Sequence, residues 1–162
     1  GATVATTTSA ANIDLVKSLG ADVVIDYRKE DFETILKDYD VVLNSQDKKS
    51  LEKSLRILKP GGKVISISGP PDPDFAIQIN GNFFLKIVMW LLSASVRKNA
   101  KRLGVNFSFL FMRAEGEQLS QITQLIEAGV IKPVIDKMFP FEQTNEALSY
   151  VETGRAKGKV II

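Results

Sequence analysis

The stretch Leu51-Glu-Lys-Ser-Leu-Arg-Ile-Leu-Lys-Pro-Gly-Gly-Lys-Val-Ile-Ser-Ile-Ser-Gly-Pro-Pro71 decides the fold. Leu51, Leu55 and Leu58 recur at the spacing of one helix face, which predicts a helix. We expect Pro60-Gly61-Gly62 to end it, because proline cannot continue a helix and glycine accepts the left-handed turn that follows one.

The second half of this stretch predicts a buried strand. Residues 63–68 are rich in β-branched side chains, and Gly69-Pro70-Pro71 ends the run abruptly. Helix, glycine turn and strand together make half of a parallel β-α-β layer. Because ligands of open parallel sheets bind beyond the carboxyl ends of the strands, Ser68 and Gly69 are the first candidate ligand contacts.

The rest of the chain repeats this unit. We expect strands at residues 3–7, 22–26, 40–44, 63–68, 105–111 and 159–162, and an extended segment at 134–139. The expected helices span residues 9–19, 31–36, 47–58, 83–103, 116–128 and 142–153, and a loop with three prolines, mobile or covering a ligand, spans 70–82. Strands that alternate with helices indicate the α/β class.

Composition narrows the function classes. The chain has 162 residues, 44% of them hydrophobic, which is enough for one domain with a full core. The net charge of +2 is too small to suggest nucleic acid. The chain contains no Cys and no His, which excludes a disulfide scaffold, the usual zinc sites, a thiol nucleophile and a Ser-His triad within it.

Two further features bear on location. The most apolar run, residues 83–96, is shorter than the ~20 residues that a bilayer requires, and Lys86 interrupts it, so no membrane span is expected. The lack of cysteine is consistent with a cytoplasmic protein. A strand that begins almost at Gly1 suggests a chain cut from something longer.

Five segments carry a family resemblance through their order and spacing. They are Leu19-Gly-Ala-Asp-Val-Val-Ile-Asp-Tyr27, Ser54-Leu-Arg-Ile-Leu-Lys-Pro-Gly-Gly-Lys63, Gly116-Glu-Gln-Leu119, Glu127-Ala-Gly-Val-Ile-Lys-Pro-Val-Ile-Asp136 and Gly154-Arg-Ala-Lys-Gly-Lys-Val160. Together they resemble the carboxyl-terminal half of the medium-chain dehydrogenase/reductase superfamily, in its zinc-independent, quinone-oxidoreductase-like branch.

The resemblance implies a fold and a function. The fold would be a Rossmann-like parallel sheet with helices on both faces, truncated so that its first strand and Gly-rich loop are absent. Residues 1–133 would form the truncated dinucleotide-binding domain, and residues 134–162 would return to a catalytic domain. The intact parent would be a cytoplasmic enzyme that transfers hydride from NADPH, with NADH less favoured, to a small quinone or enone. This chain alone would be inactive.

The chain departs from the pattern at the phosphate loop. No Gly-x-Gly-x-x-Gly motif is present to hold a pyrophosphate. The missing strand would sit mid-sheet, so its two neighbours would lie about 10 Å apart, too far to pair. The sheet could close over the gap, the first strands could dock elsewhere, a second copy could fill the gap, or a cleaved piece could stay bound.

By resemblance, the cofactor-binding residues follow the predicted strands. They are Thr8, Ser9 and Asn12 after the first strand, Tyr27 after the second, Ser45 after the third, Ser68 and Gly69 after the fourth, and Phe111 after the fifth. The first group would meet the adenosine ribose and its 2′-phosphate, and the lack of an acidic residue there favours NADPH. Phe111 would lie beside the nicotinamide. No residue is a convincing general acid or base.

Each assignment has a structural alternative. Ser9 could only cap a helix, Tyr27 could be an aromatic turn residue beside solvated charges, and Phe111 could belong to the core. The apolar half of the 83–103 helix could be core or the interface of a homo-oligomer. As a whole, the chain could be a non-catalytic Rossmann-like binding or scaffold module, or, less favoured, part of a methyltransferase.

Overall fold

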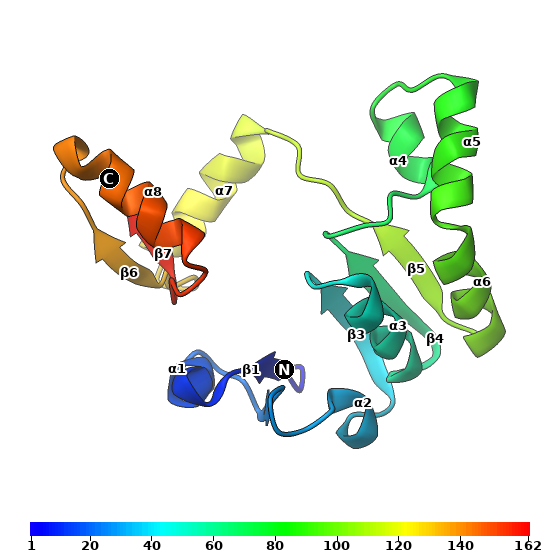
Figure 1. Cartoon of the computed structure of the whole chain (residues 1–162), viewed down its shortest axis with the longest axis horizontal. Coiled ribbons are helices and arrows are strands. Elements are labelled where there is room, and N and C mark those ends of the chain that lie inside the picture. The colour runs from blue at the N-terminus through cyan, green and yellow to red at the C-terminus, as the bar shows by residue number, and fades with distance from the viewer. The chain divides into compact units, whose positions relative to one another are not determined.

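Strands and helices alternate along the whole chain, as the sequence predicts (Figure 1). The computed structural model describes every residue, Gly1–Ile162. The elements are β1 Ala5–Thr8, η1 Ala10–Asn12, α1 Ile13–Ser18, β2 Val23–Asp26, α2 Phe32–Ile35, β3 Tyr39–Asn44, α3 Lys48–Arg56, β4 Leu58–Ser66, α4 Pro73–Gln78, α5 Phe83–Leu92, α6 Ala94–Leu103, β5 Asn106–Phe109, α7 Gly116–Glu127, β6 Ile135–Met138, η2 Phe141–Gln143, α8 Thr144–Glu152 and β7 Lys159–Ile161.

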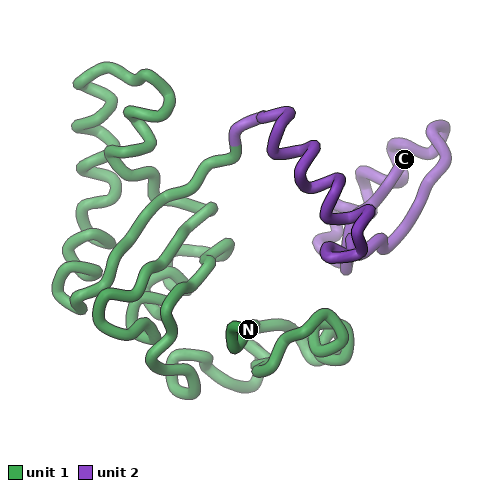
Figure 2. The backbone as a smooth tube through the Cα atoms, turned by 180° about the vertical axis from the view of Figure 1, so that it is seen from behind, with its two compact units in different colours: residues 1–112 green, residues 113–162 purple.

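The strands form parallel sheets flanked by helices, which confirms the predicted Rossmann-like α/β class. Their orders are β1-β2, β3-β4-β5 and β6-β7, and every pair runs parallel. The chain divides into two units, Gly1–Met112 and Arg113–Ile162 (Figure 2). The division predicted at residue 133 refers to a catalytic domain outside this chain, and it stays a prediction.

The Pro60-Gly61-Gly62 segment lies inside strand β4, and the prediction that it ends a helix is wrong. Helix α3 has already ended at Arg56. The register between β3 and β4 jumps from Tyr39↔Leu58 to Val41↔Lys63, so the segment forms a bulge. A Cβ on Gly62 would lie 3.1 Å from the Tyr39 carbonyl oxygen, which explains why glycine is needed there.

The expected loop at residues 70–82 contains helix α4. The Asp72 carboxylate accepts a hydrogen bond from the Phe75 backbone N–H at 3.0 Å, and Pro73 occupies the first turn. An aspartate cap followed by proline is a favourable helix start, so a short helix forms where the prolines suggested a loop.

The expected long helix at residues 83–103 is two helices, and the break falls at Ser93. The buried Ser93 hydroxyl donates to the Met89 carbonyl at 2.8 Å and accepts from Arg97 Nε at 3.0 Å. A serine hydroxyl that bonds back to the preceding turn bends helices, which separates α5 from α6.

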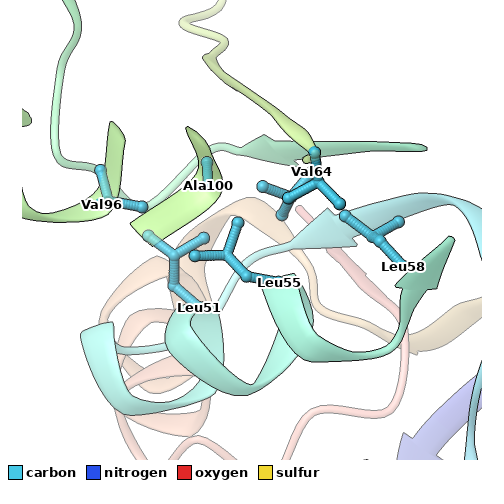
Figure 3. Close-up of a cluster of buried hydrophobic side chains, with 7 residues drawn as sticks. Leu51, Leu55, Leu58, Val64, Val96 and Ala100 are labelled. Atoms are coloured by element: carbon cyan, nitrogen blue, oxygen red, sulfur yellow. The ribbon is translucent and has the colours of Figure 1, made fainter. Parts of the chain in front are cut away.

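A hydrophobic core covers one face of the β3-β4-β5 sheet. Figure 3 shows Leu51 and Leu55 of α3 pointing toward Val96 and Ala100 of α6. The cluster, here called the sheet core, consists of Leu51, Leu55, Leu58, Val64, Val96, Ala100 and Val105. Leu51 and Leu55 therefore mark the buried face of α3, whereas Leu58, which was predicted on the same helix face, begins β4.

A second cluster joins the two sheets of the first unit. Ile25 of β2, Leu36 and Ile57 form its buried centre, here called the bridging core. Ala5 of β1 and Val42 of β3 pack against it. Strand β1 nevertheless pairs only with β2, so the sheet does not close over the gap, and side chains of the bridging core pack between the two sheets without backbone pairing.

The second unit combines α7, the β6-β7 pair and α8. The Tyr150 hydroxyl donates to Asp136 Oδ2 at 2.6 Å and so ties α8 to β6. The hydrogen bond from Tyr150 holds the pKa of Asp136 below its usual range and, in return, raises the pKa of Tyr150. Gly158 lies so close to the Val134 backbone that a Cβ would meet the Val134 carbonyl oxygen at 2.4 Å.

Candidate functional site

The carboxyl ends of β1 and β2 bring two predicted residues together. The Tyr27 backbone N–H donates to the Thr8 carbonyl at 3.2 Å, directly beyond the last paired residues Thr8 and Asp26. Asp26 is buried, and its Oδ1 accepts from the Arg28 N–H at 3.1 Å, which shapes the turn. The Tyr27 ring is exposed, and the Arg28 guanidinium lies 5.9 Å from its centre.

Ser9 and Asn12 lie in the turn that follows β1. Ser9 stands at the start of η1 but makes no capping hydrogen bond with its side chain, so its hydroxyl is not used as a cap. The Oδ1 of Asn12 is buried without a hydrogen-bond partner. A buried polar atom without a partner is costly, and a bound polar group would satisfy it.

The carboxyl ends of β3 and β4 form a second polar group. The Ser68 hydroxyl donates to Asn44 Oδ1 at 3.2 Å and to the Gln46 carbonyl. The Ser66 hydroxyl donates to the Gly69 carbonyl at 2.7 Å. The predicted residues Ser68 and Gly69 are thus held in place by Asn44 and Ser66, which are both buried.

Asn44 and Ser66 were not among the predicted cofactor-binding residues. Each ends a strand with a buried polar side chain, which is uncommon without a partner. Asn44 is the last residue of the predicted strand at 40–44, whereas Ser66 lies inside the predicted strand at 63–68, where no sequence signal singles it out. Ser45, which was predicted, is exposed beside them and has no side-chain hydrogen bond.

Phe111 belongs to an aromatic cluster rather than to these polar groups. Its ring lies 5.4 Å from Phe75 of α4 and 6.3 Å from Phe109 of β5. The buried Asp72 carboxylate organises the cluster, because it caps α4 and also accepts from the Phe109 N–H at 2.9 Å. Asp72 was missed, although the Asp72-Pro73 pair is a recognisable helix start.

Hollows follow the strand ends, and Gln46 lines three of them. One, of about 560 Å³, is lined by Tyr27, Arg28, Lys29 and Lys49. Another, of about 220 Å³, is lined by Ser68 and Gly69. The third, of about 430 Å³, lies between β1 and β3. Tyr27, Ser45, Ser68 and Gly69 each line one of these hollows, which share Gln46. The other predicted residues, Thr8, Ser9, Asn12 and Phe111, line none of the three.

The charge around the Tyr27 hollow is mainly positive. Lys53 is engaged by Asp31, and this contact lowers the pKa of Asp31 and raises that of Lys53. Arg28, Lys29 and Lys49 also line the hollow and form no ion pair. The hollow therefore suits an anionic ligand group such as a phosphate.

No group of three or more His, Cys, Asp or Glu side chains in the chain could hold a metal ion. None of the helices combines the length and the apolar character that a membrane crossing requires.

Comparison with known proteins relates the chain to a family. A family model described as zinc-binding dehydrogenase matches residues 19–162. The 2-methylene-furan-3-one reductase of Solanum lycopersicum is 35% identical over 98% of this chain and 33% of its own length. The chloroplastic NADPH-dependent alkenal/one oxidoreductase of Arabidopsis thaliana is 32% identical over the same shares.

A solved structure agrees with the fold. The quinone oxidoreductase from Coxiella burnetii superimposes with a TM-score of 0.73 at 24% identity, covering 98% of this chain and 44% of that protein. The chain therefore spans about a third of the two plant relatives and less than half of this structural neighbour.

Proposed function

Because this chain belongs to the zinc-binding dehydrogenase family, as a carboxyl-terminal half of the medium-chain dehydrogenase/reductase superfamily, we propose that it is the nucleotide-binding part of an NADPH-dependent oxidoreductase. The whole protein would reduce the activated double bond of a small enone or quinone. Two relatives support this reading, since they are named as a furanone reductase and an NADPH-dependent alkenal/one oxidoreductase.

One observation carries the proposal. Polar groups at the carboxyl ends of four parallel strands adjoin hollows that share Gln46, where open parallel sheets bind nucleotides. The positive lining near Tyr27 fits a phosphate. The Asn12 Oδ1, which lies outside the three hollows and has no partner, would accept a hydrogen bond from a ribose hydroxyl. The residues present thus fit a dinucleotide with an additional phosphate.

The roles of this chain's residues follow from their places. Thr8, Ser9 and Asn12 would hold the adenosine ribose, and Tyr27 would cover the adenine or meet the 2′-phosphate. Ser45, Ser68 and Gly69 would orient the remainder of the cofactor, and Phe111 would shield the ring from water. When bound, the nicotinamide supplies the hydride, so the chain contributes position rather than a general acid or base.

Zinc does not fit this part of the protein. The chain has neither Cys nor His, and no acidic cluster replaces them. We derive no step through zinc despite the family's description.

Calorimetric titration of the chain with NADPH and, separately, NADH tests the proposal. We expect saturable NADPH binding that is weaker for NADH, because a charge-assisted contact to the 2′-phosphate contributes roughly 1.5–3 kcal/mol, which is at least about tenfold in affinity. The double variant Ser9→Ala with Tyr27→Ala should lose this binding. Ser120→Ala on α7 is the matched control, since its hydroxyl bonds only within its own helix.

Absence of binding to a well-folded chain would favour the second candidate, a non-catalytic Rossmann-like module. The observation that keeps this candidate open is that Thr8, Ser9, Asn12 and Phe111 line none of the three hollows. Cytoplasmic location and a homo-oligomeric state are further proposals. Two of the relatives are named as chloroplastic and mitochondrial proteins, so relatives of this chain work in several compartments.

A further inference from the structure

Helix α5 turns an apolar side outward. It packs against α4 and α6 (Figure 1), and Met89 is its only buried residue. Five exposed side chains recur at the spacing of one helix side and are here called the α5 face; they are Phe83, Phe84, Ile87, Trp90 and Leu91. Helices of soluble domains normally turn such a stripe toward the core, so an outward stripe indicates a partner outside the chain.

Helix α6 carries a basic side. Arg97, Lys98, Lys101 and Arg102 are spaced so that they share one side of α6, whereas its buried residues belong to the sheet core. None of the four forms an ion pair within the chain. This side, here called the α6 basic face, therefore presents positive charge that no acidic side chain neutralises.

Arg97 joins the α6 basic face to the α5 face. Its Nη2 donates to the Trp90 carbonyl at 2.8 Å, and its guanidinium lies 5.3 Å from the centre of the Trp90 ring. The Ser93 hydroxyl accepts from its Nε at 3.0 Å and helps to hold it there. Because a cation is attracted to the face of an indole ring, the two faces border one another at a fixed contact.

The net positive charge of the chain comes from this region. Residues 75–112 contain five of the 21 basic residues and none of the 19 acidic ones. The other residues therefore contain sixteen basic and nineteen acidic side chains, which is a small net negative charge. An anionic surface would accordingly be attracted to α5 and α6 rather than to the rest of the chain.

We propose that α5 and α6 bind the surface of a bilayer that contains anionic phospholipids. The α5 face would lie at the boundary between headgroups and acyl chains, and the α6 basic face would contact the lipid phosphates. Phenylalanine, tryptophan and leucine beside lysine and arginine are the usual composition of a helix that lies in this interface. Helix α5 has ten residues, half of the ~20 that crossing requires, so it would lie on the bilayer without spanning it.

A second copy of the chain fits these faces less well. A two-fold interface places the same surface of both copies together, so a dimer through the α5 face would also bring the two α6 basic faces close to each other. A bilayer with anionic lipids supplies acyl chains for the α5 face and negative charge for the α6 basic face at the same time.

Trp90 provides a direct test, because it is the only tryptophan of the chain and is 50% exposed on the α5 face. The probe is vesicles of equal parts phosphatidylcholine and phosphatidylserine, and vesicles of phosphatidylcholine alone are the control. We expect the mixed vesicles to shift Trp90 emission to shorter wavelength, and bromine on their acyl chains to quench it. The control vesicles should bind at least about tenfold more weakly, and added salt should weaken binding to the mixed vesicles because it screens charge.

One pair of variants tests the α5 face. Phe84→Glu places a charge where acyl chains would lie and should weaken co-sedimentation with the mixed vesicles at least about tenfold. Phe141→Glu makes the same change at an equally open phenylalanine of the second unit and should leave binding unchanged. If Phe84→Glu does not fold, as judged by circular dichroism, Phe83→Glu replaces it.

A second pair tests the α6 basic face. Lys98→Gln together with Lys101→Gln removes two positive charges and should weaken binding to the mixed vesicles at least about tenfold. Lys132→Gln together with Lys157→Gln removes two exposed charges of the second unit and should change binding much less. Equal losses in both double variants would show that only the overall charge matters and would overturn the proposal.

Other results would also overturn it. The chain could fail to bind the mixed vesicles, or it could bind them with unchanged Trp90 emission, which would place the contact elsewhere. Sedimentation without lipid could show a dimer that Phe84→Glu dissociates, which would assign the α5 face to a second copy. A longer protein that contains this chain and does not bind the vesicles would show that another segment covers the α5 face. None of these measurements depends on NADPH, so they stand apart from the test of the proposed function.

Discussion

Asp72 shows at the scale of one residue how a buried carboxylate organises its surroundings. One oxygen caps α4 at Phe75 and the other accepts from Phe109 of β5. Because hydrogen bonds to charged groups are the strong ones, Asp72→Ala should lower the free energy of unfolding by roughly 2–4 kcal/mol, measured by urea denaturation. Asp72→Asn keeps one acceptor oxygen, so its free energy of unfolding should fall by less than that of Asp72→Ala. Equal decreases in the two variants would contradict this prediction.

Gly62 provides a second prediction at this scale. A Cβ there would meet the carbonyl oxygens of Lys59, Asp40 and Tyr39 at 2.9–3.1 Å. These are backbone atoms that cannot rotate away, so Gly62→Ala should destabilise the chain by about 1–3 kcal/mol. Gly116→Ala is the matched control, because a Cβ on Gly116 meets nothing within 4 Å. Thermal melting of both variants measures the effect. Similar melting midpoints for Gly62→Ala and Gly116→Ala would contradict this prediction, because they would show that the bulge tolerates a side chain.

At the scale of elements, the sequence predicted what local chemistry determines. Asp31 and Asp47 were expected to open helices, and each accepts a backbone N–H at its helix start. The Pro60-Gly61-Gly62 bulge was not predictable, because it depends on how closely β4 approaches Tyr39 across the sheet. The break between α5 and α6 likewise depends on the burial of Ser93. Helix and strand propensities alone predict neither the bulge nor the break.

The candidate site divides in the same way. Tyr27 and Thr8 meet because strand ends of a parallel sheet coincide, which the sequence pattern is sufficient to predict. Asn44, Ser66 and Asp72 were not among the predicted site residues, because their importance comes from burial and from contacts that the fold creates, such as Asn44 with Ser68 and Asp72 with Phe109. The predicted cofactor contacts themselves stay predictions until binding is measured.

The link between β6 and α8 should respond to pH. The hydrogen bond from Tyr150 lowers the pKa of Asp136 in the folded state. The link therefore contributes stability at pH values above the unfolded-state pKa of about 3.9, and this stability is lost as the pH falls through the lower pKa of the folded state. The pKa of Tyr150 is raised by Asp136, so stability present below about 10 is lost as pH rises through the folded pKa.

Removing the hydroxyl tests this link. Tyr150→Phe should accelerate hydrogen exchange of the α8 backbone amides at neutral pH. It should also reduce the dependence of α8 stability on pH at both the acidic and the basic extreme. Tyr27→Phe is the control, because the Tyr27 hydroxyl makes no hydrogen bond within the chain and lies in the other unit. An unchanged exchange profile in Tyr150→Phe would mean that the link does not stabilise the helix.

For the whole molecule, the division into two units predicts where a protease cuts first. Residues 110–115 form neither helix nor strand, and the Arg113 side chain is 70% exposed. Limited trypsin digestion should therefore cleave after Arg113 before other sites, and Arg113→Gln should abolish that product. Mass spectrometry identifies the cut; a first cut inside α3 or α6 would show that the first unit is the less stable part.

Val42 carries a consequence for how the first unit unfolds. Its side chain packs against both the sheet core and the bridging core. The β1-β2 pair, which shares no backbone bonds with the larger sheet, therefore depends on a residue that also supports that sheet. We expect the two sheets of the native chain to unfold in one cooperative transition. In Val42→Ala, the unfolding curve should instead show two separate transitions, one for each sheet.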